Sequence, residues 1–145
     1  MAQNNYLKYN QKATAATAVT AVAAGSTVGT ASTNRFLMGS VEVGTAWVAK
    51  VSMVVKTASL TLTPKIQGSN DASTWEDVFD IASTANVATA AGTGSNVTTA
   101  RSLACPVLPY KYVRCVFVTA GATAHATDDT YAVSYHWVEK GYGQP

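Results

Sequence analysis

The sequence predicts a single all-β domain, an antiparallel β-sandwich of the jelly-roll type preceded by an extended N-terminal arm. Apolar and polar residues alternate along segments 47–57, 110–119 and 130–139, which is the period of strands with one buried face. Clusters of Gly, Ser, Asn and Asp separate these segments, as expected of turns. The 145 residues suffice for one domain. Because no capped helical pattern interrupts the strands, we expect two packed sheets.

The first third of the chain carries the weakest strand signals. Residues 1–12 are polar with two tyrosines, and we expect an extended arm outside the core. Residues 13–24 are rich in Ala, Thr and Val; Ala favours helix, whereas the alternation of Thr and Val favours a strand or extended segment. Residues 25–34 indicate a loop, and residues 36–43 indicate one strand. The sandwich domain is expected to span residues 13–140.

The middle of the chain holds the first long strand. Along residues 47–57, one face carries only apolar side chains: Trp47, Ala49, Val51, Met53 and Val55. The next strand is predicted over residues 59–67, where Pro64 indicates an edge strand or a break because proline has no N–H to donate. A further strand is predicted at 75–81. Residues 82–100 are small and polar, and we expect a long segment without regular structure.

The last third contains the strongest strand, at residues 110–119, after a short strand at 101–103. Within it, Cys115 is expected to be a small buried apolar residue. The last strand is predicted over 130–139, and Asp128 and Asp129 are expected to cap the loop before it. Residues 141–145 are expected to form a tail. One face of the last strand carries Tyr131, Val133, Tyr135 and Trp137.

The composition favours a subunit that is buried in an assembly. Charged residues make up 12% of the chain, about half the usual share, and Lys and Glu are depleted at the cores of protein interfaces. The chain contains 25 Ala and 20 Thr, and such small side chains allow flat surfaces to approach closely. The alternative is that the low charge reflects a sturdy or secreted β protein.

Charge and hydropathy argue against two kinds of partner. The formal net charge is +2 and the basic residues are dispersed, whereas binding of nucleic acid needs a basic stripe interleaved with aromatic residues. No stretch approaches the ~20 apolar residues of a membrane-spanning helix. The polar start, Met1 to Asn5, lacks the features of a signal peptide. We therefore expect no nucleic-acid or membrane partner, and synthesis in a host cytoplasm.

Catalysis and metal binding find little support in the sequence. The two cysteines, Cys105 and Cys115, do not combine with His125 and His136 at the spacing of a zinc site. No nucleophile, base and orienting group can be nominated together. We expect neither an enzyme nor a cofactor. A disulfide between the two cysteines is a less favoured alternative to two free thiols.

The acidic residues in and after the turn of the hairpin at residues 65–78 allow two interpretations. In one, they bind calcium, because oxygen ligands from a turn suit that cation. In the other, which we favour, Asn70 and Asp71 shape the turn through their side chains, and the remaining carboxylates are solvated. The residues concerned are Asp71, Glu76, Asp77 and Asp80.

Four aromatic residues also allow two interpretations. If exposed, they would stack on sugar rings and form a carbohydrate-binding site. If buried, they belong to the packing between sheets, which is the common role of aromatic strand residues and the one we favour. The residues are Trp75, Trp137, Tyr131 and Tyr135.

Two motifs resemble a pattern found in bacteriophage virion proteins. Gln67-Gly68-Ser69-Asn70-Asp71 continues to Ser73 and Trp75, and the later strand reads Tyr110-Lys111-Tyr112-Val113-Arg114. The pair looks most like small capsid decoration proteins, also called cement or auxiliary capsid proteins, and the likeness covers about residues 45–138. A similar pairing occurs in discoidin-like, galactose-binding jelly rolls, but this sequence has no recognisable counterpart of the N-terminal half of those domains.

The resemblance implies a structural protein on the outer surface of a phage capsid. Its partners would be the major capsid protein and neighbouring copies of itself, with trimers at threefold positions as the arrangement that the resemblance suggests. We expect the arm to contact the shell through Tyr6, Leu7, Lys8 and Tyr9, because an extended segment can add a strand to an exposed sheet edge. Deletion of residues 1–12 is then expected to leave the fold intact and to abolish capsid binding.

Two alternatives to a decoration protein stay open at this point. One is a carbohydrate-binding β-sandwich module, which requires exposed coplanar aromatic side chains. The other is a different virion part, such as a tail or fibre-base protein, for which a β-sandwich serves equally well. Copy number in the particle separates the second alternative from a decoration protein.

Overall fold

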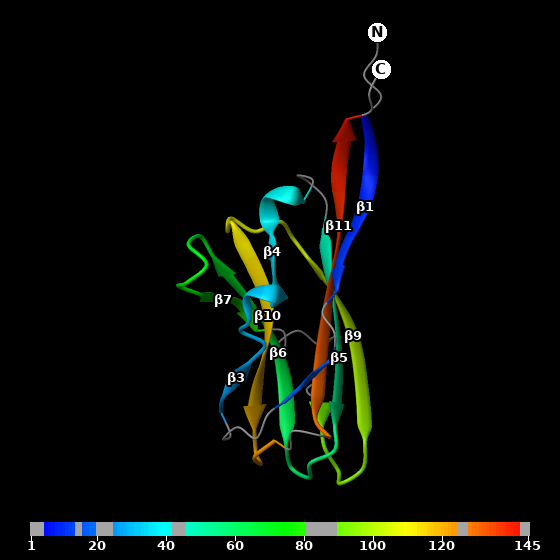
Figure 1. Ribbon diagram of the computed structural model, residues 1–145, viewed down its shortest axis with the longest axis vertical. Helices are drawn as coiled ribbons and strands as arrows, with labels where there is room; N and C mark the ends of the chain where they lie inside the picture. The colour runs from blue at the N-terminus through cyan, green and yellow to red at the C-terminus, as the bar shows by residue number, and fades with distance from the viewer. Residues whose placement is uncertain are drawn as a thin grey trace.

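The computed structural model describes residues 5–13, 16–19, 25–41, 46–80, 90–124 and 128–142. Within these ranges the chain folds into two antiparallel β-sheets that face each other (Figure 1). The predicted all-β sandwich is confirmed.

Sheet A contains the longest described strand, which has 13 residues. Its order is β1 (Asn5–Ala13), β11 (Thr130–Tyr142), β5 (Trp47–Val55) and β9 (Val97–Cys105), and the short β2 (Thr17–Ala18) also pairs with β11. Sheet B lies opposite. Its order is β3 (Thr27–Val28), β10 (Tyr112–Ala120), β6 (Thr61–Ser69) and β7 (Glu76–Asp80); β4 (Arg35–Leu37) also pairs with β10, and β8 (Ala90–Ala91) with β6.

The order of the strands is that of a jelly roll. The short β3 and β4 both pair with the same side of β10 and together act as one interrupted strand. The chain then alternates between the sheets, so that the first and last long strands are neighbours in sheet A and β10 lies between β3/β4 and β6 in sheet B. This is the doubled Greek-key arrangement, and it agrees with the jelly-roll prediction.

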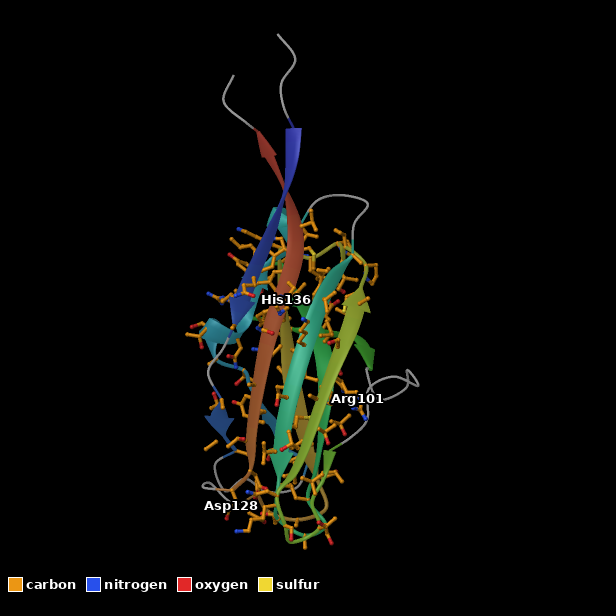
Figure 2. The ribbon with its side chains drawn as sticks, turned by 90° about the vertical axis from the view of Figure 1, so that its right-hand side faces the viewer. Arg101, Asp128 and His136 are labelled. Atoms are coloured by element: carbon orange, nitrogen blue, oxygen red, sulfur yellow. The ribbon has the colours of Figure 1, made fainter. Side chains whose placement is uncertain are left out.

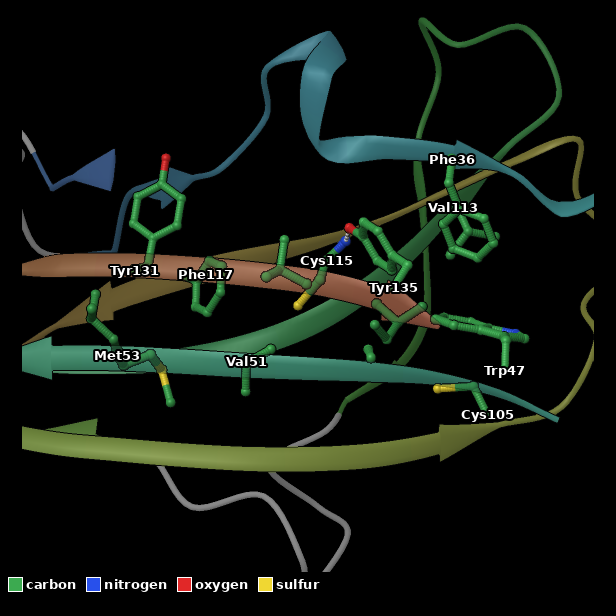
Figure 3. Packing of buried hydrophobic residues seen from close by; sticks show 14 of the residues in the cluster. Phe36, Trp47, Val51, Met53, Cys105, Val113, Cys115, Phe117, Tyr131 and Tyr135 are labelled. Carbon is green, nitrogen blue, oxygen red and sulfur yellow. Dashed lines mark hydrogen bonds between the residues drawn. The ribbon is translucent and has the colours of Figure 1, made fainter. Parts of the chain in front are cut away.

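The core lies between the sheets, as Figure 3 shows. On β5 the predicted inner face is confirmed, because Trp47, Ala49, Val51, Met53 and Val55 are all buried. On β11 Tyr131, Val133 and Tyr135 are buried, and Trp137 is partly buried against Phe36 with ring centroids 5.4 Å apart. Burying an aromatic or large aliphatic side chain contributes roughly 1.5–3 kcal/mol, so these two strands anchor the sandwich.

Two strand predictions are wrong in part. The strand predicted over residues 36–43 ends at Leu37, because Met38–Ser40 form a 3₁₀ turn closed by a hydrogen bond from Val41 N–H to the Met38 carbonyl. Gly and Ser in that turn are poor strand formers, and residues 42–45 lie outside the described residues. The structureless segment predicted for 82–100 in fact contains β8 and the first half of β9, while residues 81–89 lie outside the described residues.

Pro64 does not lie on an edge strand. It is buried in β6, between β10 on one side and β7 and β8 on the other. On that second side, β7 pairs with residues 65–68 and β8 with residues 61–62. Pro64 therefore falls at the interruption between two partner strands, where no N–H is needed for a described pair.

Candidate interaction surfaces

The predicted arm is a strand that pairs with its own chain. Residues 5–13 form β1, which runs antiparallel to residues 134–142 of β11. The far half of this two-stranded ribbon projects beyond the sandwich (Figure 1). Its backbone holds the residues expected to contact a shell, Tyr6 to Tyr9, opposite Val138 to Gly141; their side chains lie outside the described set. Residues 141 and 142, expected in a tail, belong to β11.

β1 forms one edge of sheet A. In the part of the chain that the structure describes, its only strand partner is β11, so the outer side of β1 has no paired strand. An open strand edge presents alternate N–H and C=O groups that can pair with another chain. The ribbon therefore offers a main-chain binding edge that extends past the body of the domain.

The strands of sheet A face the viewer in Figure 2, and the outer face of this sheet carries many small side chains. A shallow hollow of about 450 Å³ crosses β1, β11, β5 and β9, and Lys50 carries a charged side chain on this face. Arg101 also lines the hollow, but it pairs with the buried Val51 and so belongs to the inner face of the sheet. His136 lies on the same face of β11, 2.9 Å from the Ser134 hydroxyl, and burial, followed by the nearby Lys50, lowers its pKa. Alanine and serine predominate in the hollow: Ala13, Ala100, Ala132, Ser52, Ser102 and Ser134.

A second hollow, the β4 cleft, opens where the edges of the two sheets meet. It has a volume of about 420 Å³ and is lined by Lys12, Ser32, Arg35, Phe36, Leu37, Tyr112 and Trp137. The ammonium of Lys12 reaches from β1 to donate to the Arg35 carbonyl, and the Arg35 guanidinium lies 5.2 Å from the centre of the Tyr112 ring. Burial and the charge of Arg35 lower the pKa of Lys12. The cleft is thus aromatic and cationic.

The β4 cleft contains an unsatisfied donor. The indole N–H of Trp137 is buried and has no hydrogen-bond partner among the described residues. Leu37, on the rim, is 50% exposed, which is unusual for a leucine in this domain. A buried donor without an acceptor costs about 1–3 kcal/mol, so this indole N–H lowers the stability of the wall of the cleft.

The β6–β7 hairpin is shaped by its own side chains. Asp71 Oδ1 accepts hydrogen bonds from the Ser73 and Thr74 N–H groups and from the Ser69 hydroxyl, at 2.7–3.0 Å. Asn70 Oδ1 accepts from the Lys111 N–H at 2.9 Å. The interpretation that the turn is shaped by its own side chains is therefore confirmed for Asp71, whereas Asn70 ties the turn to Lys111, just before β10.

Two further hairpin carboxylates, Glu76 and Asp77, are exposed and also have protein partners. Glu76 accepts a hydrogen bond from the Tyr110 hydroxyl at 2.9 Å. Asp77 accepts from Lys65 Nζ at 2.8 Å and from Gln67 Nε2 at 2.9 Å. Among the described residues, no three His, Cys, Asp or Glu side chains gather as a metal site would require. His125 lies outside the described residues, as does the side chain of Asp80.

The aromatic residues considered for sugar binding mostly pack inside the protein. Tyr131 contacts Phe117 with centroids 4.8 Å apart, and Tyr135 contacts Phe36 at 4.6 Å. Trp75 is half-buried, and the Arg114 guanidinium covers one face of its ring at 4.0 Å. The packing interpretation is confirmed for the two tyrosines.

The two thiols are unreactive by position. Cys105 and Cys115 form no disulfide and are fully buried, so the expected burial of Cys115 is confirmed. Burial raises the pKa of Cys105 to about 12 and that of Cys115 further still. Because the thiolate is the nucleophilic form, neither side chain is suited to covalent chemistry in the folded state. Within the described ranges, no helix is long and apolar enough to cross a membrane.

Comparison with known proteins supports the fold. No family model matches the chain, and no curated protein matches it. Among solved structures, it is similar to a chain in the structure of the infectious bursal disease virus Gx strain, with a TM-score of 0.51 and 13% sequence identity. The match covers 98% of this chain and 34% of that chain, so this protein spans about a third of its neighbour's length. A likeness at this identity shows a shared fold.

Proposed function

We propose that this protein is a structural virion protein that binds the outside of a bacteriophage capsid and stabilises the shell by bridging neighbouring major capsid proteins. The observation that carries the proposal is the projecting β1–β11 ribbon, whose β1 edge has no paired strand among the described residues. The jelly-roll fold, shared with a chain of a virus structure, and the small-residue face of sheet A give further support.

The proposed contact is addition of a strand. An extended segment of the shell would pair with the outer edge of β1, so that main-chain hydrogen bonds supply affinity and the side chains of Tyr6 to Tyr9 supply specificity. No catalytic step is part of this function. A protein that binds only the assembled shell stabilises it by mass action, by roughly 2.7 kcal/mol per site at a hundred times the dissociation constant.

Copy number tests the role in the particle. Particles are purified, and this chain is quantified by mass spectrometry against the most abundant shell protein. We expect a ratio near one or a simple fraction of it. A few copies per particle would place the protein in the tail or fibre base instead, and absence from particles would rule out the virion role.

Two proline variants test the β1 edge. Along an edge strand, successive N–H groups point alternately to the neighbouring strand and to the open side. Of Leu7→Pro and Lys8→Pro, one therefore removes an N–H that faces β11, and the other removes an N–H that faces the open edge. We expect a lower melting temperature only for the variant that loses the N–H facing β11. Both variants are expected to lose shell binding.

Alanine at the same two positions is the matched control, because it changes the side chain and keeps the N–H. These point variants are sharper than deletion of residues 1–12, which would also expose the edge of β11. One proline variant is expected to keep its melting temperature. If that variant still coats the shell at full occupancy, binding through the β1 edge is contradicted.

A further inference from the structure

Opposite charges lie at the two edges of sheet B, and among the described residues these charges form no ion pair. At the β4 edge, Lys12 and Arg35 line the β4 cleft. At the β7 edge, Asp71 and Glu76 line a smaller hollow on the hairpin. The ion pairs found among the described residues use other side chains: Lys56–Asp128, and Lys65–Asp77 within the β6–β7 hairpin.

The acids of the hairpin are fixed in place and stay charged. Hydrogen bonds from the Thr74 and Ser73 backbone hold the pKa of Asp71 well below its usual value, so this carboxylate is ionised at neutral pH. Glu76 is held by the Tyr110 hydroxyl. Both side chains are exposed, and because their partners are neutral, the hairpin keeps its negative charge.

The β4 cleft is complementary to such a hairpin in charge and in polarity. It supplies two cations, Lys12 and Arg35, and an aromatic wall, and a carboxylate can accept charge-assisted hydrogen bonds from such cations. The half-exposed Leu37 on its rim would gain burial on contact. The Arg35 carbonyl on β4 already accepts a hydrogen bond from the Lys12 ammonium. The contact between the hairpin and the cleft would therefore be made by side chains and not by adding a strand to β4.

From this complementarity we propose that the protein associates head to tail, with the β6–β7 hairpin of one copy seated in the β4 cleft of the next. The two surfaces lie on opposite edges of one sheet, so a copy cannot satisfy its own cleft. A heterologous contact of this kind closes into a ring when the rotation between copies allows it, and otherwise continues as a filament. The proposal concerns contacts between copies and does not depend on shell binding.

Charge reversal tests the contact. The mass of the purified full chain is measured by light scattering coupled to size-exclusion chromatography, over a range of concentrations and at low and high salt. We expect a multiple of 15.1 kDa for the unmodified protein at low salt, with a shift toward 15.1 kDa at high salt because salt screens exposed charges. Arg35→Glu and Glu76→Lys are each expected to give the monomer mass, and the double variant is expected to restore the assembly.

Controls separate loss of contact from loss of fold. Lys50→Glu reverses an exposed charge on the outer face of sheet A and is expected to leave the mass unchanged. Glu76→Gln keeps an acceptor for Tyr110 and removes only the charge, so it should weaken association without lowering the melting temperature. A monomer at every concentration, or an unchanged mass for Arg35→Glu, would overturn the proposal. Either result leaves the shell-binding test, which is read on particles, unaffected.

Discussion

Asp129 links two neighbouring segments of sheet A, the start of β11 and the turn after β5. Its carboxylate is fully buried and accepts hydrogen bonds from the Lys56 N–H at 2.8 Å, the Thr57 N–H at 3.1 Å and the Thr57 hydroxyl at 2.6 Å. It thereby ties the start of β11 to the turn after β5, whereas the sequence predicted that it caps the loop before β11. Asp128 beside it makes a partly exposed ion pair with Lys56, at 3.3 Å.

Replacing Asp129 is therefore expected to destabilise the fold far more than replacing its neighbour. Asp129→Ala leaves three donors without their acceptor and should lower the free energy of unfolding by about 2–3 kcal/mol. Asp128→Ala is the matched control and should cost roughly 0–1 kcal/mol, as exposed ion pairs do. Urea unfolding of both variants measures the difference, and equal losses would show that the buried cap is not the main contribution.

Asp71 makes the hairpin sensitive to acid. The Thr74 and Ser73 N–H groups, followed by the Ser69 hydroxyl, lower the pKa of Asp71 from its ordinary value of 3.8. A carboxyl whose pKa falls on folding contributes stability that is fully present above the unfolded-state pKa of about 4. That contribution is lost as the pH falls toward the folded-state pKa.

Asp71→Asn should therefore make the free energy of unfolding depend less on pH under acidic conditions. The amide oxygen can still accept hydrogen bonds, but it does not titrate. We expect the unfolding free energy of the variant to fall less steeply than that of the unmodified protein from about pH 5 downward, as measured by urea unfolding at a series of pH values. Asp77, whose pKa is lowered by hydrogen bonds from Lys65 and then Gln67, should leave a residual slope. Parallel curves would show that Asp71 contributes nothing.

At the scale of elements, β9 is an edge strand with a single charged side chain. Its sequence is otherwise Val, Thr, Ala, Ser, Leu and Cys, and within the described ranges its nine residues pair only with β5. Arg101 is exposed at its centre, and its guanidinium donates to the Ala100 carbonyl at 2.9 Å. Charged residues on edge strands discourage pairing with other chains, so Arg101 protects this edge.

Removing that charge should make β9 associate with other chains. Arg101→Thr replaces the cation with a good strand former, and we expect light scattering to rise with time at concentrations where the unmodified protein is constant. Lys50→Thr, on the interior strand β5, is the control and should not scatter, because that strand has partners on both sides. Equal behaviour of the two variants would show that Arg101 has no protective role.

The elements that sequence analysis predicted well are those with one apolar face. The alternation from Trp47 to Val55 and from Tyr131 to Trp137 marks buried faces directly. The first half of β9 was missed because Thr98, Thr99 and Ala100 show no apolar period; pairing with β5, a tertiary effect, makes this segment a strand. The 3₁₀ turn after Leu37 was missed because apolar residues continue beyond Leu37, although the pairing of β4 with β10 ends there.

At the scale of the whole molecule, the strand order brings together residues that the sequence separates. Lys12, Arg35 and Trp137 meet in the β4 cleft only because β1 pairs with β11 and β4 lies across from them. Sequence analysis identified the arm as a contact element, but no local pattern indicates this cleft. An unpaired indole N–H and a pair of cations are visible only once the topology is known.

Tyr135 links the two sheets at the point where sheet B is interrupted. Its hydroxyl donates to the Asn34 carbonyl and accepts from the Cys115 N–H, both at 2.6 Å. β3 pairs with β10 at residues 117–118 and β4 at residues 112–114, so Cys115 lies between them without a described strand partner on that side. The tyrosine of sheet A thus satisfies the donor that the break in sheet B leaves open.

Tyr135→Phe should consequently weaken the whole sandwich and not only one side-chain contact. The variant keeps the ring among its core neighbours but leaves the buried Cys115 N–H unsatisfied, which costs about 1–3 kcal/mol. Tyr112→Phe is the control, because no described group bonds to that hydroxyl, and it should be nearly neutral. We expect urea unfolding to show the loss only for Tyr135→Phe, and hydrogen exchange to show faster exchange at the Cys115 amide. If both variants unfold at the same urea concentration, the hydroxyl does not join the sheets, and packing alone holds them together.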